Sequence, residues 1–262
     1  MKMDLVSTTR TGSGTLVSTT RHSLIEYKQY GGNYNEISWA GMHGDDYAQF
    51  IDHIGHPTDA LKYNNVFIHI PKTGGISIRD TMAGYSVFPD HFFVRDVKEK
   101  IGFENVWSYT FMRNPYKRIV SVYEHIAAKP IAWHNLMDTF PFPPGPRNDK
   151  SFGKFVDLIT TKLFWDILWE PQTSWIYDID GEVGVDYVGR TETMQKDLNE
   201  ITTLIGQHNN LPIEPKKLSH KNKTSWRYPN YKDYYTDSSV RKKVEKYYEK
   251  DIDFLKVSFN DA

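Results

Sequence analysis

The sequence predicts an α/β fold in which a parallel sheet is flanked by helices, in three layers. Two observations lead to this prediction: residues 66–82 and residues 107–128 each read as a strand, a turn and a helix in succession. Parallel strands need a crossover connection, which is usually a helix. Repeated strand–turn–helix units therefore favour a parallel sheet with helices on its faces.

The first unit begins with Val66–Ile70, a nearly continuous β-prone run that is typical of a strand buried on both faces. The sequence PKTGG at 71–75 interrupts this run. Ile76–Met82 can then continue as a helix, so the glycine-containing turn connects a strand end to a helix start.

The second unit begins with the β-prone run Trp107–Met112. Asn114 is a plausible N-cap, and Pro115 suits the first helical position, where its missing N–H does no harm. Tyr116–Ala128 has apolar residues at helical spacing and is predicted to be the helix.

The rest of the chain is less regular. The predicted segments are a proline-rich loop at 129–150, a helix at 151–169, a strand at 185–188 followed by a helix to about 205, a loop-like stretch at 211–235, and a final helix at 238–248 capped by Asp237. A loop as long as the first of these usually serves as a lid or a binding loop.

The chain has 262 residues, which suits one compact domain with a small appendage. We expect the domain to span residues 64–262. Residues 1–63 form a variable N-terminal segment, expected to be an arm or a hairpin. Within it LVSTTR occurs twice, at 5–10 and 16–21, a unit too short for a solenoid repeat.

Composition excludes several classes of protein. The 32 Lys+Arg and 33 Asp+Glu give a net charge of −1, which argues against a bulk nucleic-acid binder. The absence of cysteine excludes disulfides and thiolate metal sites. No apolar run approaches the roughly 20 residues of a membrane span, and the N-terminus lacks a signal-peptide pattern. The expected localisation is therefore cytoplasmic; nothing in the sequence sets the oligomeric state.

The turn after the first strand has the composition of a phosphate-binding loop. Gly74 and Gly75 allow backbone N–H groups to converge on an anion, and the following helix points its positive end at the same place. Lys72 adds a charge, and Thr73 and Ser77 add hydroxyl groups. The pattern differs from the nucleotide-triphosphate loop, because GxxxxGK[ST] is absent and the lysine precedes the glycines.

A second candidate anion site follows the second strand. Arg113 lies at the strand end, the edge at which parallel sheets bind ligands, and Ser121 lies two turns into the next helix. An arginine fork and a hydroxyl suit a phosphate. Two such turns at neighbouring strand ends indicate a ligand with phosphates at both ends of a nucleoside.

These two segments, IHIPKTGGISI at 68–78 and FMRNPYKRIVSVY at 111–123, resemble the two cofactor signatures of sulfotransferases. Their amino-acid sequences are most similar to those of the carbohydrate branch, which includes heparan sulfate 2-O-sulfotransferase. Further similarity runs through Pro171-Gln172, through 186–192 and through 234–255, so the resemblance covers about residues 64–257. It implies a nucleotide-kinase-like (P-loop) sulfotransferase fold.

The resemblance also implies the activity and the roles of individual residues. The enzyme would move a sulfuryl group from 3′-phosphoadenosine 5′-phosphosulfate (PAPS) to an acceptor hydroxyl, on a carbohydrate. Lys72 would contact the 5′-phosphate and the bridging oxygen. The remaining implied nucleotide contacts are Thr73, Gly74, Gly75 and Ser77 at the phosphosulfate, Arg113 and Ser121 at the 3′-phosphate, and Lys221 and Lys223 in a covering loop.

A base is needed to take the proton of the acceptor hydroxyl, and a histidine suits this role. His91 resembles the histidine that serves as base in the 2-O-sulfotransferase relatives, although Asp90 stands where they have glycine. Glu124 and His125 are possible substitutes. The polar residues between His43 and His56 are interpreted as an ordinary polar segment, so no metal is expected.

Other functions remain compatible with these motifs. One is a sulfotransferase that acts on a non-carbohydrate small molecule. Another is a small-molecule kinase, although neither signature has the lysine order that a kinase would need. A third is a catalytically dead protein that binds a nucleotide or a glycan.

Overall fold

A computed structural model describes residues 64–83, 85–88, 91–101, 106–128, 149–161, 166–214, 216–219 and 226–261. The predicted N-terminal arm or hairpin at 1–63, most of the predicted loop at 129–150, and the residues Lys221 and Lys223 lie outside this description. Within the described ranges, no helix is both long and apolar enough to cross a membrane.

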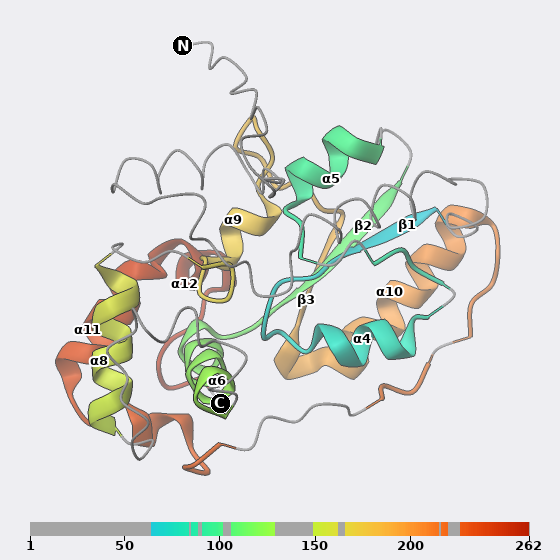
Figure 1. Ribbon diagram of the computed structural model, residues 1–262. Helices are drawn as coiled ribbons and strands as arrows, with labels where there is room; N and C mark the ends of the chain where they lie inside the picture. Colours follow the sequence, from blue (N-terminus) through green and yellow to red (C-terminus); the bar gives the residue numbers. More distant parts are fainter. Residues whose placement is uncertain are drawn as a thin grey trace, which may run out of the picture.

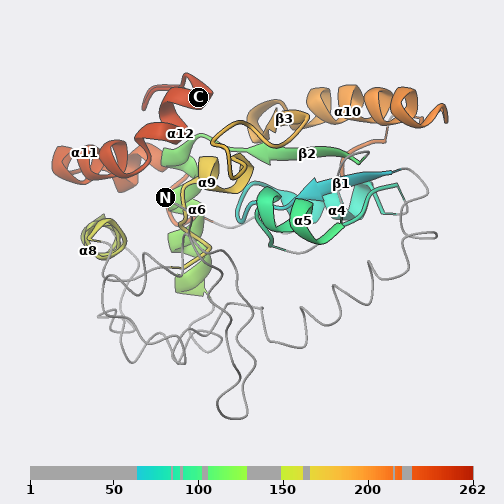
Figure 2. The ribbon, with the colours of Figure 1, turned by 90° about the horizontal axis from the view of Figure 1, so that it is seen from above.

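Three parallel strands form one sheet in the order β1-β2-β3 (Figures 1 and 2). Their bounds are Asn65–Ile68 for β1, Trp107–Met112 for β2 and Tyr187–Arg190 for β3. Ile68 stands opposite Thr110 in β2, and Met112 stands opposite Arg190 in β3. The predicted parallel α/β sheet is confirmed, and the carboxyl ends of all three strands meet at one edge.

Helices cover both faces of this sheet, which gives the predicted three layers. In Figure 1, α5 and α9 lie above the strands, and α4 and α10 lie below them. The bounds are Gly75–Thr81 for α4, Val94–Ile101 for α5, Gln172–Ile176 for α9, Met194–Asn209 for α10 and Glu249–Leu255 for α12. The last of these packs against α9 on the upper face.

Alternation along the strands divides the core into two layers. Phe67, Tyr109 and Phe111 face α4 and α10. Val66, Ile68 and Met112 face α5, α9 and α12. Successive side chains of a strand point to opposite faces, so a short run that is apolar throughout can be covered on both sides.

The helix after β2 packs beside the sheet and not on its faces. This helix, α6, spans Pro115–Ala128, and its buried side chains gather with those of α8 (Asp149–Thr160), α11 (Ser238–Tyr247) and the short 3₁₀ helix η5 (Tyr231–Tyr234). Figure 2 shows α6, α8 and α11 grouped at one end of the sheet. The expectation that each crossover helix covers a face is therefore wrong for α6.

Both predicted helix caps are confirmed. The Asn114 side-chain oxygen accepts a hydrogen bond from the N–H of Tyr116 at 3.0 Å, and Asp237 accepts one from the N–H of Ser239 at 2.7 Å. These bonds satisfy amide groups that the first turn of a helix leaves without partners.

Several predicted boundaries are wrong. The first strand ends at Ile68, because the Ile70 carbonyl already accepts a turn hydrogen bond from the Thr73 hydroxyl. The third strand runs over 187–190 and not 185–188, and the helix that follows it continues to Asn209. The predicted helix 151–169 ends at Thr160, and residues 166–170 form turns.

The predicted final helix at 238–248 is confirmed as α11, which ends at Tyr247, and a helix that was not predicted, α12, follows after Tyr248. The hydroxyl of Tyr248 is buried and donates to the Trp169 carbonyl at 2.6 Å. This long-range anchor fixes the chain at the junction.

Gly189 in β3 provides a test of core packing. A Cβ atom at this position would lie 2.6 Å from the Phe111 ring, closer than carbon atoms can approach. We expect Gly189→Ala to lower the free energy of unfolding by about 1–3 kcal/mol, measured by urea titration. In a Phe111→Leu background the same substitution should cost less, and an equal cost in both backgrounds would contradict this packing.

Candidate functional site

The loop between β1 and α4 is compact because two of its residues are left-handed. Lys72 has a φ of 67° and Gly74 a φ of 83°. The left-handed region costs a residue with a Cβ about 1–2 kcal/mol, so the surroundings must hold Lys72 in place. The Thr73 hydroxyl donates to the Ile70 carbonyl at 2.9 Å, and the Gly74 carbonyl accepts from the N–H of Ser77 at 2.9 Å. Thr73, predicted as an anion donor, thus ties the loop to the strand end.

The two glycines of this loop are required by packing within the protein. A Cβ at Gly75 would lie 2.0 Å from the His69 ring, and one at Gly74 would lie 2.5 Å from the methyl group of Met194. From the sequence, these glycines are predicted to let backbone N–H groups bind an anion. In the structure they also let a histidine ring and a methionine approach the loop.

His69 and His91 lie side by side. Their ring centroids are 4.2 Å apart, and His91 Nδ1 lies 2.9 Å from the His69 carbonyl oxygen. A carbonyl can only accept, so Nδ1 of a neutral His91 ring carries the proton and Nε2 carries the lone pair. His91 is half-buried, and this tautomer is the one that a general base would use through Nε2.

His69 itself is held neutral. Its side chain is buried, and this burial lowers the pKa of His69 well below 6.5, with any charge on His91 and the charges of Arg79 and Lys72 acting in the same direction. Sequence reasoning missed this residue because it continues the apolar run that forms β1. The signal available was its position directly before the PKTGG turn.

Arg113 connects the two predicted anion-binding turns. It follows β2 directly, and its guanidinium donates to the Lys72 carbonyl at 3.4 Å. Burial lowers the pKa of Arg113 to about 10, while the negative charge of Glu192 acts the other way, so Arg113 stays protonated at neutral pH. The guanidinium also lies over the Trp226 ring at 5.4 Å.

Arg118 holds the same loop from inside the protein. It is only 1% exposed, and it donates to the carbonyls of Pro71, Leu168 and Glu170 at 2.9, 3.0 and 2.8 Å. Sequence analysis did not single out Arg118, since only the folded chain brings these three carbonyls together. Its role is to position the loop that carries Lys72.

Ser121 and Lys117 lie on α6, the helix that follows Arg113. Ser121 is buried, two turns into the helix, and Lys117 precedes it by four residues, so the two share a helix face. Burial lowers the pKa of Lys117; the charge of Glu192 opposes this shift, and that of Arg113 adds to it. Lys117 is a third basic group in the neighbourhood that the motif reading did not include.

The two alternative candidates for the base, Glu124 and His125, lie on α6, further along the helix than Ser121. Glu124 is fully buried and accepts hydrogen bonds from the Tyr234 hydroxyl at 2.5 Å and from the N–H of Arg227. This carboxylate belongs to the aromatic cluster that joins α6 to η5. His125 is half-buried on the same helix.

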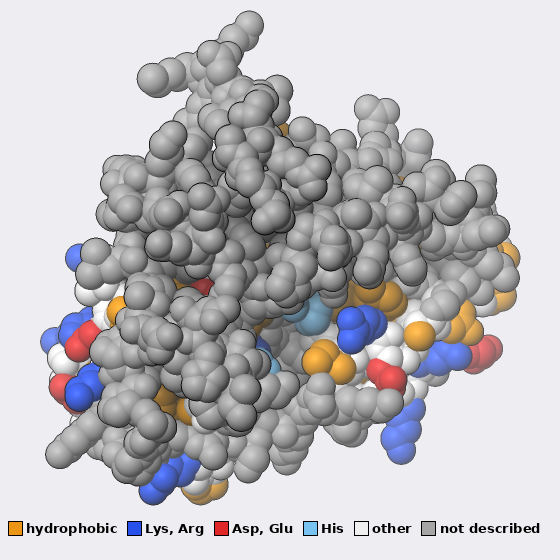
Figure 3. All heavy atoms as spheres, viewed as in Figure 1, with side chains coloured by type: hydrophobic (Ala, Val, Ile, Leu, Met, Phe, Trp, Pro, Cys, Tyr) orange, Lys and Arg blue, Asp and Glu red, His pale blue; other side chains and the backbone are white. Residues whose placement is uncertain are grey.

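The surface near this region combines polar and apolar groups. Figure 3 shows histidine side chains near the middle of the face in view, with basic and hydrophobic side chains beside them. Among the residues that the structure describes, no group of three or more His, Asp or Glu side chains could hold a metal ion. The polar segment from His43 to His56 lies outside those residues.

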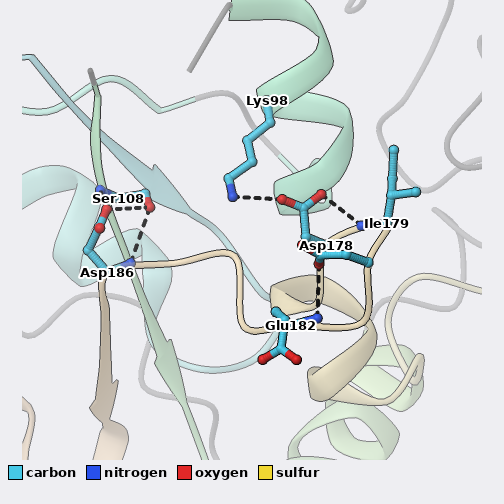
Figure 4. Close-up of polar contacts among 7 residues, drawn as sticks. Lys98, Ser108, Asp178, Ile179, Glu182 and Asp186 are labelled. Carbon is cyan, nitrogen blue, oxygen red and sulfur yellow. Dashed lines mark hydrogen bonds and ion pairs between the residues drawn. The ribbon is translucent and has the colours of Figure 1, made fainter. Parts of the chain in front are cut away.

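A separate polar cluster lies at the opposite end of the strands (Figure 4). The Asp186 carboxylate accepts from the N–H and the hydroxyl of Ser108 at 2.6 and 2.9 Å, and Lys98 pairs with Asp178 at 2.7 Å. Ser108 is near the start of β2, whereas Arg113 follows its end. Asp186 joins the segment before β3 to β2, and Asp178 joins α5 to the segment after α9, so neither belongs to the candidate site.

The buried His69 makes the stability of the fold depend on pH. In the unfolded chain its pKa is near 6.5, and in the folded chain it is lower, so the unfolded state binds more protons as the pH falls. Relative to His69→Asn, we expect the free energy of unfolding of the unsubstituted chain to decrease from about pH 7.5 to about pH 5, measured by urea titration. His69→Asn should be less stable throughout but should lose part of this pH dependence. The same slope in both proteins would contradict the burial argument.

Comparison with known proteins identifies the family of the chain. Residues 56–258 match the model of the Sulfotransferase family, a match that contains both turns, α6 and α12. No curated protein and no solved structure matches the chain significantly. Since the family match covers well over half of the sequence, the chain belongs to the Sulfotransferase family.

Proposed function

We propose that this sulfotransferase uses PAPS as its donor and a carbohydrate hydroxyl as its acceptor. Membership of the family establishes sulfuryl transfer as the general chemistry. The observation that carries the choice of donor is the contact between Arg113 and the Lys72 carbonyl. It brings two basic turns together at adjacent strand ends, the edge at which parallel sheets bind nucleotides.

In this proposal the first turn holds the 5′-phosphosulfate. Gly74, Gly75 and Ser77 contribute N–H and hydroxyl groups from the start of α4, and Thr73 shapes the loop through its bond to Ile70. Lys72 lies beside the bridging oxygen and stabilises the charge that develops there as the sulfur–oxygen bond breaks.

The second turn would hold the 3′-phosphate. Arg113 supplies a guanidinium fork and Ser121 a hydroxyl, and Lys117 adds positive charge nearby. Such a site distinguishes PAPS from a donor that lacks the 3′-phosphate.

Lys221 and Lys223 are proposed to contact the nucleotide from a covering loop. The chain enters this segment at Ser219, whose N–H donates to the Thr81 hydroxyl at the end of α4. It leaves at Trp226, which lies against Arg113. The segment therefore starts beside the helix of the first turn and ends beside the arginine of the second, which supports a role for both lysines.

His91 is the proposed base. Its Nε2 takes the proton from the acceptor hydroxyl as the acceptor oxygen forms a bond to sulfur. The bond between sulfur and the bridging oxygen breaks, and the electron pair stays on the 5′-phosphate of the leaving 3′-phosphoadenosine 5′-phosphate (PAP). The positive charge on His91 and the negative charge on the phosphate thus develop together.

The carbohydrate acceptor rests on the likeness of the two motifs to the heparan sulfate 2-O-sulfotransferase branch. The test is incubation with radiolabelled PAPS and a panel of glycans, with phenols and steroids as the comparison set. Label on glycans supports the proposal. Label only on phenols or steroids overturns the acceptor class, and PAP binding without any transfer indicates a catalytically dead protein.

Calorimetry with PAP and with ATP distinguishes a PAPS-dependent sulfotransferase from a small-molecule kinase. We expect PAP to bind and ATP to bind more weakly, because the site is built for a 3′-phosphate. Tighter binding of ATP than of PAP would favour a small-molecule kinase.

Lys72→Ala should remove most of the turnover. Loss of the group beside the bridging oxygen is expected to lower kcat by about 10²–10³-fold, the effect of removing one transition-state donor. Activity is measured with labelled PAPS, and the urea midpoint checks the fold. The control is Lys243→Ala on α11, where an exposed lysine pairs with Asp157. Near-normal turnover of Lys72→Ala would remove this residue from the mechanism.

His91→Ala should slow transfer while donor affinity is kept. A general base contributes about 10²–10⁴-fold to the rate, so kcat should fall by such a factor, whereas calorimetry with PAP should give an unchanged Kd. His208→Ala, an exposed histidine on α10, serves as the matched control. If the rate of His91→Ala is unchanged, the base lies elsewhere.

A further inference from the structure

Gln172 pairs with both backbone groups of Arg113. Its side-chain oxygen accepts from the N–H of Arg113 at 2.8 Å, and its side-chain nitrogen donates to the carbonyl of Arg113 at 2.8 Å. Gln172 is the first residue of α9 and is fully buried. The Gln172 side chain thus satisfies both backbone groups of Arg113, as the backbone of a neighbouring strand would.

Asp251 of α12 fixes the orientation of this amide. The carboxylate of Asp251 accepts from the N–H groups of Gln172 and Thr173, both at 2.8 Å, and from the Thr173 hydroxyl at 2.8 Å. It also accepts from the side-chain nitrogen of Gln172 at 3.3 Å. Because a carboxylate can only accept hydrogen bonds, the nitrogen of Gln172 faces Asp251, and its oxygen faces the Arg113 N–H.

The backbone beyond Arg113 is fixed as well. The N–H of Asn114 donates to the Glu192 carboxylate at 3.1 Å, and the side chain of Asn114 caps α6. With the backbone held on both sides, the direction in which the Arg113 side chain leaves the strand is set. Its guanidinium then lies between the Lys72 carbonyl and the Trp226 ring.

We infer that Gln172 is a positioning residue for recognition of the nucleotide 3′-phosphate, and that Asp251 holds it in the required orientation. This inference rests on the proposed function, since it concerns the phosphate that Arg113 would bind. Gln172 acts through Arg113 and does not touch the nucleotide. A buried side chain that fixes the backbone of a binding residue is expected to affect the affinity for the group that this residue contacts.

The experiment compares two ligands that differ only in the 3′-phosphate. Calorimetry measures the Kd of PAP and of adenosine 5′-phosphate for the full chain and for Gln172→Met, which removes the amide at nearly constant volume. We expect PAP affinity to fall by about 10- to 100-fold, while the affinity for adenosine 5′-phosphate stays within about two-fold. The preference for the 3′-phosphate would largely disappear.

Thr173→Val is the matched control. It removes a hydrogen bond to the same Asp251 carboxylate in the same buried cluster but leaves the pairing between Gln172 and Arg113 intact. Its preference for PAP should equal that of the unsubstituted chain. Gln172→Asn, which keeps an amide but is one methylene too short to reach both groups of Arg113, should show the same selective loss if Gln172→Met fails to fold.

The outcomes separate the inference from the proposed function. If the unsubstituted chain shows no preference for PAP, the proposed donor fails. If that preference is present and persists in Gln172→Met and Gln172→Asn, the inference is overturned while the function stands. An equal loss for both ligands would show that Gln172 only supports the fold, and this result also overturns the inference.

Discussion

The loop that carries Lys72 depends on one buried guanidinium. Arg118 donates to the carbonyls of Pro71, Leu168 and Glu170, and so joins the loop after β1, the turns before α9 and the helix after β2. Each buried carbonyl left without a donor would cost about 1–3 kcal/mol. Arginine spreads its donors over three nitrogens in a fixed planar fork, and Arg118 uses one nitrogen for each carbonyl, whereas the donors of a lysine all belong to one nitrogen. The candidate site is therefore held in place by Arg118, a buried cation that the bound nucleotide is not expected to contact.

Parallel pairing explains why the two basic turns meet. Adjacent strands in the same direction bring their carboxyl ends to one edge, so the loop after β1 and the residue after β2 lie next to each other although they are about 40 residues apart in sequence. The side chain of Arg113 then reaches the Lys72 carbonyl. Behind this contact, Gln172 and Asp251 bring α9 and α12 to the same strand end. Segments from four parts of the chain thus determine one side-chain direction.

Local patterns predicted the features that are local in origin. The apolar runs of β1 and β2, the caps Asn114 and Asp237, and the helix α6 depend on residues close in sequence, and the structure confirms them. The roles of Arg118 and Gln172 depend on partners 47–79 residues away, so no window of sequence contains the signal. The same reason applies to the bond between the Tyr248 hydroxyl and the Trp169 carbonyl, which lie 79 residues apart. The sequence motif includes Gly75, but it does not predict that a side chain at this position would collide with the His69 ring.

The neutral state of His69 matters for the proposed reaction because its ring lies 4.2 Å from that of His91. A second positive charge at this distance would disfavour the imidazolium that His91 must become when it takes the acceptor proton. Burial of His69 removes that charge, and the carbonyl of the same residue accepts from His91 Nδ1. One residue at the end of β1 thus sets the tautomer of the proposed base and limits the positive charge beside it. The burial that weakens His69 as a base therefore favours proton transfer to His91.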